Sequence, residues 1–126
     1  MKIYIVKETT IDEKRVSLVP DVAKKFIKDG FDVFLEKDAG YMSKFTDEDY
    51  SSLGVNIDDN HENISDADII FCVRMPDDNL INKIKSGACL IGLLNPYDNK
   101  EKLELLSKKG INAFSMELIP RSPRAQ

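Results

Sequence analysis

Histidine, cysteine and closely spaced glycine are scarce in this chain of 126 residues. The one histidine, His61, lies in a polar segment without a partner at metal-ligand spacing, so we expect no metal site. It also belongs to no Ser-His-Asp or Cys-His pattern of the kind that nucleophilic catalysis needs. Cys72 and Cys89 lie in apolar runs without CxxC spacing, so we expect reduced core residues of a cytoplasmic protein.

The spacing of the glycines argues against a phosphate-binding loop. They are Gly30, Gly40, Gly54, Gly87, Gly92 and Gly110, and no two are closer than five positions. A dinucleotide-binding fingerprint needs glycines two apart after a strand, because the backbone must approach the diphosphate closely. We therefore expect no diphosphate site within this chain.

Charge and hydropathy exclude two further classes of function. The net charge of −4 argues against binding to nucleic acid, whose phosphates need a basic surface. The longest apolar run, residues 88–94, is far shorter than the roughly 20 residues of a membrane-spanning helix. Neither nucleic acid nor a bilayer is an expected partner of this domain.

Short apolar runs alternate with amphipathic stretches along the chain, which predicts an α/β fold. The predicted strands are residues 3–6, 32–36, 68–73, 88–94 and 111–116. Apolar strands separated by helices indicate a parallel sheet with helices on both faces. We predict a five-stranded parallel sheet of order 2-1-3-4-5, a flavodoxin-like or Rossmann-like three-layer fold. Residues 55–57 could add a short extended piece.

The connection between the first strand and the first helix, residues 7–19, is long for its type, for which about 2–6 residues is usual. It should lie at the carboxyl edge of the sheet, where such sheets bind ligands. Arg15 in this connection and Arg74 at the end of the third strand could together clamp a carboxylate or phosphate. Alternatively, Arg15 pairs with Glu8 or Glu13, and Arg74 with Asp77. Asn95 could face the same crevice or cap the turn that follows it.

An ordered set of residues carries a resemblance to a known family over essentially the whole chain. The set comprises Lys7, Glu8, Arg15, Val16, Pro20, Gly30, Glu36, Ala39, Gly40, Asp47, Tyr50, Gly54, Ala67, Asp68, Ile69, Ile70, Val73 and Pro76. It resembles the N-terminal domain shared by alanine dehydrogenases and the α subunit of proton-translocating NAD(P) transhydrogenase. The C-terminal residues, from Met116 to Arg121 and from Arg124 to Gln126, resemble the transhydrogenase branch.

The transhydrogenase resemblance implies a role in hydride transfer between NADH and NADP⁺, coupled to proton translocation. It assigns Arg121, Ser122 and Gln126 to the nicotinamide end of NAD(H), with Gln126 as the catalytic residue. Ser122 and Pro123 depart from the usual aliphatic residue and serine of the family. Residues 1–119 would form the N-terminal domain, and residues 120–126 would begin a linker into a second domain that binds most of the coenzyme.

The resemblance also implies partners and a location. The expected partners are that C-terminal NAD-binding domain, an NADP-binding component and a membrane component, and the complete protein would be a homodimer. The domain would be cytoplasmic and peripheral to the inner membrane through these components. The fragment alone would be inactive.

The alanine dehydrogenase branch implies a different use of the same edge. There, residues matching Arg15 and Arg74 hold the carboxylate of the substrate, and a catalytic histidine occupies the position of Asn95. An amide cannot accept a proton near neutral pH, so this activity is disfavoured. Two alternatives remain open: an amino- or keto-acid dehydrogenase domain that uses Arg15 and Arg74, and a stand-alone binding domain without catalysis.

Overall fold

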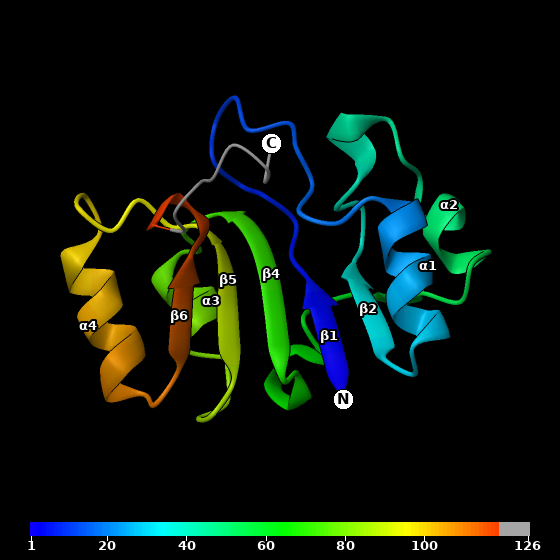
Figure 1. The fold of residues 1–126 in the computed structure, drawn as a ribbon. Helices are drawn as coiled ribbons and strands as arrows, with labels where there is room; N and C mark the ends of the chain where they lie inside the picture. The colour runs from blue at the N-terminus through cyan, green and yellow to red at the C-terminus, as the bar shows by residue number, and fades with distance from the viewer. Residues whose placement is uncertain (119–126) are drawn as a thin grey trace, which may run out of the picture.

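Six parallel strands form one sheet of order β3-β2-β1-β4-β5-β6 (Figure 1). The computed structural model describes residues 1–118. The strands are β1 (Lys2–Ile5), β2 (Asp32–Glu36), β3 (Asn56–Asp58), β4 (Ile69–Arg74), β5 (Cys89–Leu93) and β6 (Asn112–Ser115). The predicted strands are all present, in the predicted relative order and all parallel, which confirms the α/β class.

The predicted number of strands was wrong, because β3 adds a sixth strand outside β2. Asn56 and Asp58 flank a single apolar residue, Ile57, so the sequence pattern of this strand is weak. Its pairing depends on backbone bonds to β2 and on Asp58, which accepts a hydrogen bond from the buried hydroxyl of Tyr4 at 2.6 Å. With this strand the order becomes that of a Rossmann sheet instead of a flavodoxin sheet.

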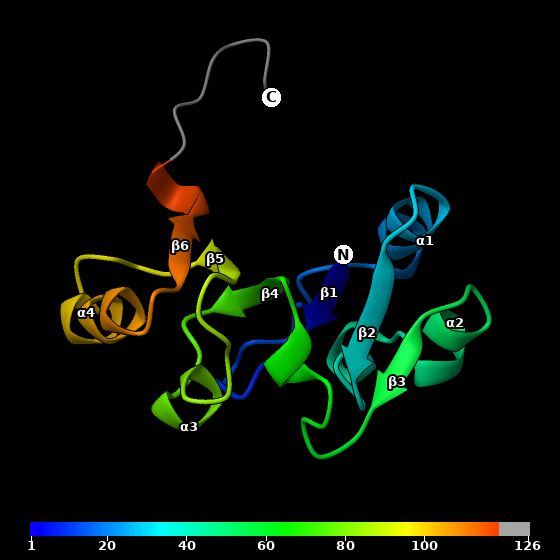
Figure 2. The ribbon, with the colours of Figure 1, turned by 90° about the horizontal axis from the view of Figure 1, so that it is seen from below.

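Helices lie on both faces of the sheet, as predicted, and Figure 2 shows α1 and α3 on opposite sides. The helices are α1 (Pro20–Lys28), α2 (Asp47–Ser51), α3 (Asp78–Ile81) and α4 (Lys100–Lys108), with 3₁₀ turns η1 (Tyr41–Ser43), η2 (Ile64–Asp66) and η3 (Met116–Leu118). Ala23 of α1 and Tyr50 of α2 pack on Ile3 and Ile5 in one core. The second core holds Leu80, Ile81 and Leu106 from α3 and α4, against Tyr4, Ile70 and Leu90.

Local signals explain where two of the helices begin. Pro20 occupies the first turn of α1, where its missing N–H costs nothing. Thr46 and Asp49 form a reciprocal capping box at the start of α2. The helix predicted to run from Asp77 or Asp78 to Gly87 is shorter than expected: α3 ends at Ile81, and turns follow it. Within residues 1–118 no helix has the length and apolar character needed to cross a membrane.

The chain runs outward from β1 through β2 to β3, and from β4 through β5 to β6. The carboxyl ends of β1 and β4, at the centre, therefore lie where the direction of the sheet reverses. The long connection of residues 7–19 rises over this edge in Figure 1. This location fits the position that the sequence analysis assigns to it.

Candidate functional site

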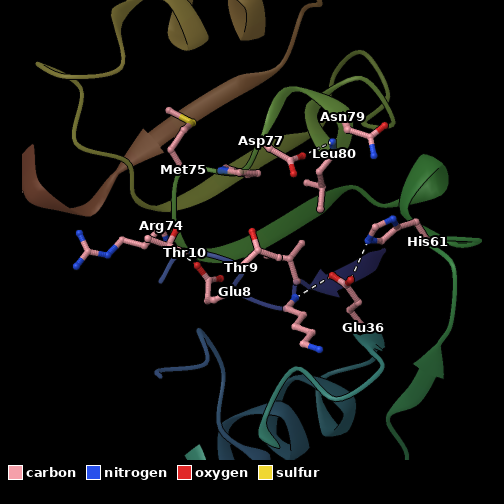
Figure 3. A pocket seen from close by; sticks show the side chains of 13 residues that line it. Glu8, Thr9, Thr10, Glu36, His61, Arg74, Met75, Asp77, Asn79 and Leu80 are labelled. Carbon is pink, nitrogen blue, oxygen red and sulfur yellow. Dashed lines mark hydrogen bonds and ion pairs between the residues drawn. The ribbon is translucent and has the colours of Figure 1, made fainter. Parts of the chain in front are cut away.

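A small hollow of about 70 Å³ lies at the carboxyl ends of β1, β2 and β4, where the sheet reverses (Figure 3). The segments Glu8–Thr10 and Arg74–Asp77 form two of its walls, and Glu36 and His61 close a third side. Most of its polar groups are charged, and they come from segments far apart in the sequence. The hollow is therefore a meeting point of the two halves of the sheet.

Glu8 joins the two halves directly. Its carboxylate accepts hydrogen bonds from the backbone N–H of Val73 at 2.9 Å and of Arg74 at 2.7 Å. Burial raises the pKa of Glu8, and these two backbone donors oppose that rise. The end of β4 thus directs backbone N–H groups to a carboxylate of the protein itself.

Glu13 lies between the two arginines that the sequence analysis singled out. Its carboxylate accepts hydrogen bonds from Nε and Nη2 of Arg15, each at 2.9 Å, and from Nε of Arg74 at 2.8 Å. The Glu13 side chain is 4% exposed, whereas those of Arg15 and Arg74 are 58% and 50% exposed. Hydrogen bonds from Arg15, and then from Arg74, lower the pKa of Glu13 to about 2.

This arrangement decides between the alternatives for the arginine pairs. The pairing of Arg15 with Glu13 is confirmed. The pairing of Arg74 with Asp77 was wrong: Arg74 binds Glu13, and Asp77 caps α3 by accepting a hydrogen bond from the N–H of Leu80. The fold does bring the two guanidinium groups to one place, but around an internal carboxylate. That they bind an external anion stays a prediction.

Glu36, His61 and Lys83 form a chain of contacts that the sequence analysis did not find. Oε2 of Glu36 lies 2.8 Å from Nε2 of His61, and Nδ1 of His61 lies 2.8 Å from Nζ of Lys83. With Lys83 donating to Nδ1, Nε2 carries the proton that is donated to Glu36. Glu36 also accepts a hydrogen bond from the N–H of Lys7. Within the described part of the chain, no three His, Cys, Asp or Glu residues form a group that could hold a metal ion.

Asn95 caps the turn that follows β5. Its Nδ2 donates to Asp98 at 2.9 Å, and its backbone N–H donates to Glu117 at 2.7 Å. The capping interpretation of Asn95 is therefore confirmed. The residues that the resemblance assigns to the nicotinamide, Arg121, Ser122 and Gln126, lie outside the described residues, so that assignment stays a prediction.

Residues 4–126 match the family described as "Alanine dehydrogenase/PNT, N-terminal domain". The chain is 39% identical over 133 aligned positions to the first of the polypeptides named as NAD(P) transhydrogenase subunit alpha in Rickettsia prowazekii, covering 100% of this chain and 34% of the relative. It is 36% identical to the NAD(P) transhydrogenase subunit alpha of Haemophilus influenzae, covering 100% of this chain and 24% of that protein. Identity to alanine dehydrogenase 1 of Staphylococcus aureus is lower, 30%, with 100% and 34% covered.

A solved structure shows the same similarity. The transhydrogenase from Sinorhizobium meliloti superposes with a TM-score of 0.94 at 35% identity, over 100% of this chain and 38% of that one. The chain thus spans between about a quarter and two fifths of the length of the relatives it matches. On this evidence the chain belongs to the family of alanine dehydrogenase/PNT N-terminal domains.

Proposed function

We propose that this chain acts as the N-terminal domain of an NAD(P) transhydrogenase α subunit. In that role it helps to orient the nicotinamide of NAD(H) for hydride transfer to NADP⁺, coupled to proton translocation. Support comes from the relatives named as transhydrogenase α subunits, to which identity is higher than to alanine dehydrogenase 1. Because the chain spans only a fraction of those relatives, the rest of the site has to come from other polypeptide segments.

The observation that carries this proposal is the charge at the sheet reversal. Glu8, Glu13 and Glu36 all place carboxylates at the edge where a Rossmann sheet usually accepts a diphosphate. Carboxylates close to a diphosphate would repel it, and the connection after β1 contains no glycine that would let the backbone approach it. These features support binding of the coenzyme mainly by a second, C-terminal domain.

The chemistry of hydride transfer fits a domain of this kind. Transfer between two nicotinamide rings needs close and dry positioning but no protein nucleophile or base. In this proposal Arg121, Ser122 and Gln126 contact the nicotinamide half, and Gln126 is the catalytic residue. Residues 1–119 form the domain, and residues 120–126 begin the linker to the NAD-binding domain.

The same proposal sets the partners. The NADP-binding and membrane components of a transhydrogenase complete the reaction, and the complete α subunit is a homodimer. The domain then lies on the cytoplasmic side, peripheral to the inner membrane through those components. The isolated chain transfers no hydride.

An alanine dehydrogenase-like function has one observation in its favour, the convergence of Arg15 and Arg74 on one point. Two observations weigh against it. Glu13 already occupies that point, and Asn95 offers a non-titrating amide that is hydrogen-bonded to Asp98. The transhydrogenase role therefore has more support.

Two measurements test the proposed function. The isolated chain should show no saturable heat of binding with NADH in calorimetry. The chain should then be joined to the remainder of the Rickettsia prowazekii relative and combined with that organism's other transhydrogenase polypeptides. This assembly should transfer hydride from NADH to an NADP⁺ analogue, and Gln126→Ala should lower kcat with little change in KM.

Tyr97→Ala is the matched control, because Tyr97 is an exposed side chain to which the proposal gives no role. It should leave kcat unchanged. An unchanged kcat in Gln126→Ala would remove Gln126 from the mechanism. Micromolar NADH affinity of the isolated chain would contradict the division of labour between the two domains.

A further inference from the structure

The register of the sheet aligns one row of apolar side chains across five strands. Leu35, Ile5, Phe71, Ile91 and Phe114 are successive partners on β2, β1, β4, β5 and β6. Directly paired residues project to the same face of a sheet. Along this row burial falls steadily: Leu35 and Ile5 are 0% exposed, Phe71 and Ile91 are half-buried, and Phe114 is 54% exposed.

A second row shows the same gradient. Ile3, Ile69 and Cys89 are partners on β1, β4 and β5, and burial falls from 0% exposed at Ile3 to half-buried at the other two. Met116, just beyond β6, is 48% exposed. We call the set Ile69, Phe71, Cys89, Ile91, Phe114 and Met116 the open face.

The figures show the reason for this gradient. In Figure 1 no helix of residues 1–118 lies in front of β4, β5 and β6, and in Figure 2 α3 lies on the side opposite α1. A hollow of about 290 Å³ lies on this side, with Phe71, Ile91, Leu93 and Met116 in its wall. The hydroxyl of Ser17 lines the same hollow and is buried without a hydrogen-bond partner in the described part of the chain.

The handedness of the connections explains why the described chain leaves this face open. Parallel strands are joined by right-handed crossovers, so the face that a helix covers depends on the direction in which the chain moves along the sheet. From β1 to β3 the chain moves one way, which places α1 and α2 on one face. From β4 to β6 it moves the other way, which places α3 and α4 on the opposite face. The missing cover for β4 to β6 has to come from outside residues 1–118.

We propose that the open face is the docking surface for an amphipathic α-helix, supplied by the portion of an α-subunit polypeptide that this chain does not match. The inference rests on the proposed function. Parallel sheets are almost always covered on both faces by helices. Three strands about 4.8 Å apart span about 10 Å, which is the width of one helix.

The relatives contain the polypeptide that this helix requires. The matched region is 34% of the Rickettsia prowazekii relative and 38% of the Sinorhizobium meliloti chain, so most of each lies beyond it. The apolar stripe of the helix packs on Phe71, Ile91 and Phe114. A polar group at its edge can supply the hydrogen-bond partner that Ser17 lacks within the described residues.

Cys89 reports directly on the cover. It is half-buried on the open face, whereas Cys72 is buried on the other side of the sheet, where burial raises its thiol pKa. Alkylation of Cys89 is measured by peptide mass spectrometry in two proteins: this chain alone, and this chain joined to the remainder of the Rickettsia prowazekii relative. Docking should slow alkylation of Cys89 at least about tenfold, as expected for a site that reacts only after local opening. Cys72 should react slowly in both proteins.

Substitution tests the same contact in another way. Phe114→Thr keeps a strand-forming residue but removes the ring, so it should lower the melting temperature more in the joined protein than in the isolated chain. Tyr97→Thr removes an aromatic ring that is 78% exposed and lies outside the open face. It should change both melting temperatures equally.

Three outcomes would overturn the proposal. Equal alkylation of Cys89 in the two proteins would show that the remainder does not cover this face. Light scattering that shows a dimer of the isolated chain with Cys89 protected would assign the face to a second copy. Equal effects of Phe114→Thr in both proteins would place the helix elsewhere. None of these measurements uses nucleotide, so a joined protein that protects Cys89 but transfers no hydride would refute the proposed function alone.

Discussion

The carboxylate of Glu13 accepts a hydrogen bond from Nε of Arg74 at 2.8 Å, although 61 residues separate the two in sequence. Arg15 binds the same carboxylate through two nitrogens. Two guanidinium groups are therefore oriented around an internal group that has the shape and charge of a small carboxylic acid. An external carboxylate would have to displace Glu13 in order to bind there.

This contact predicts a stability difference that depends on pH. The pKa of Glu13 is about 2 in the folded protein and starts from an ordinary value of 4.5. A lowered folded pKa stabilises the protein above the unfolded pKa, and that stabilisation is lost as pH falls through the folded pKa. Glu13→Gln should therefore lower the unfolding free energy by about 1 kcal/mol at pH 7. The difference should shrink between pH 4.5 and pH 2.

Urea unfolding at several pH values measures this difference without adding salt. Glu104→Gln is the matched control, because Glu104 lies exposed on α4 and makes no ion pair within the described residues. It should show no such convergence at low pH. A constant difference between wild type and Glu13→Gln from pH 7 to pH 2 would mean that the charge of Glu13 contributes nothing to stability.

The same contact predicts how the chain responds to pyruvate. In the wild-type chain the side-chain Nε–H resonances of Arg15 and Arg74 should not change with pyruvate concentration, because Glu13 holds both groups. Glu13→Ala frees both guanidinium groups, so in this variant pyruvate should shift both resonances. Saturable shifts in the wild-type chain would instead favour the alanine dehydrogenase-like function.

Much of the fold could be predicted from the sequence because its strong signals are local. The buried strands are apolar at most positions, and Pro20 and Thr46 mark helix starts. The sixth strand was missed because its stability comes from distant partners: β3 pairs with β2, and Asp58 binds Tyr4, 54 residues away. A three-residue strand with two polar positions carries too little periodicity to be distinguished from a loop.

The candidate site could be predicted in position but not in pairing. The topology rule placed Arg15 and Arg74 at the carboxyl edge of the sheet, and they lie there. That Glu13 binds both of them depends on how residues 7–19 fold over the edge, which no sequence spacing encodes. His61 showed no partner by spacing, yet it contacts Glu36 and Lys83, which are 25 and 22 residues away.

Gly92 on β5 should tolerate no side chain. A Cβ atom there would lie 2.5 Å from the carbonyl oxygen and 2.6 Å from Sγ of Cys72, on the neighbouring strand. Gly92→Ala should therefore destabilise the domain by about 1–3 kcal/mol in urea unfolding. Adding Cys72→Ala should restore only part of this loss, because the carbonyl oxygen remains in place. Complete restoration would show that the sulfur alone causes the conflict.

The buried hydrogen bond between Tyr4 and Asp58 should stabilise the edge of the sheet. Asp58 is 2% exposed and also accepts hydrogen bonds from the backbone and side chain of Asn63. Tyr4→Phe keeps the ring but removes one donor from a buried carboxylate, which should cost about 1–3 kcal/mol of unfolding free energy. Hydrogen exchange should quicken first at the amides of β3, because Asp58 ends that strand. Tyr97→Phe, at an exposed tyrosine, should change neither quantity. A Tyr4→Phe variant as stable as wild type would show that Asn63 alone satisfies Asp58.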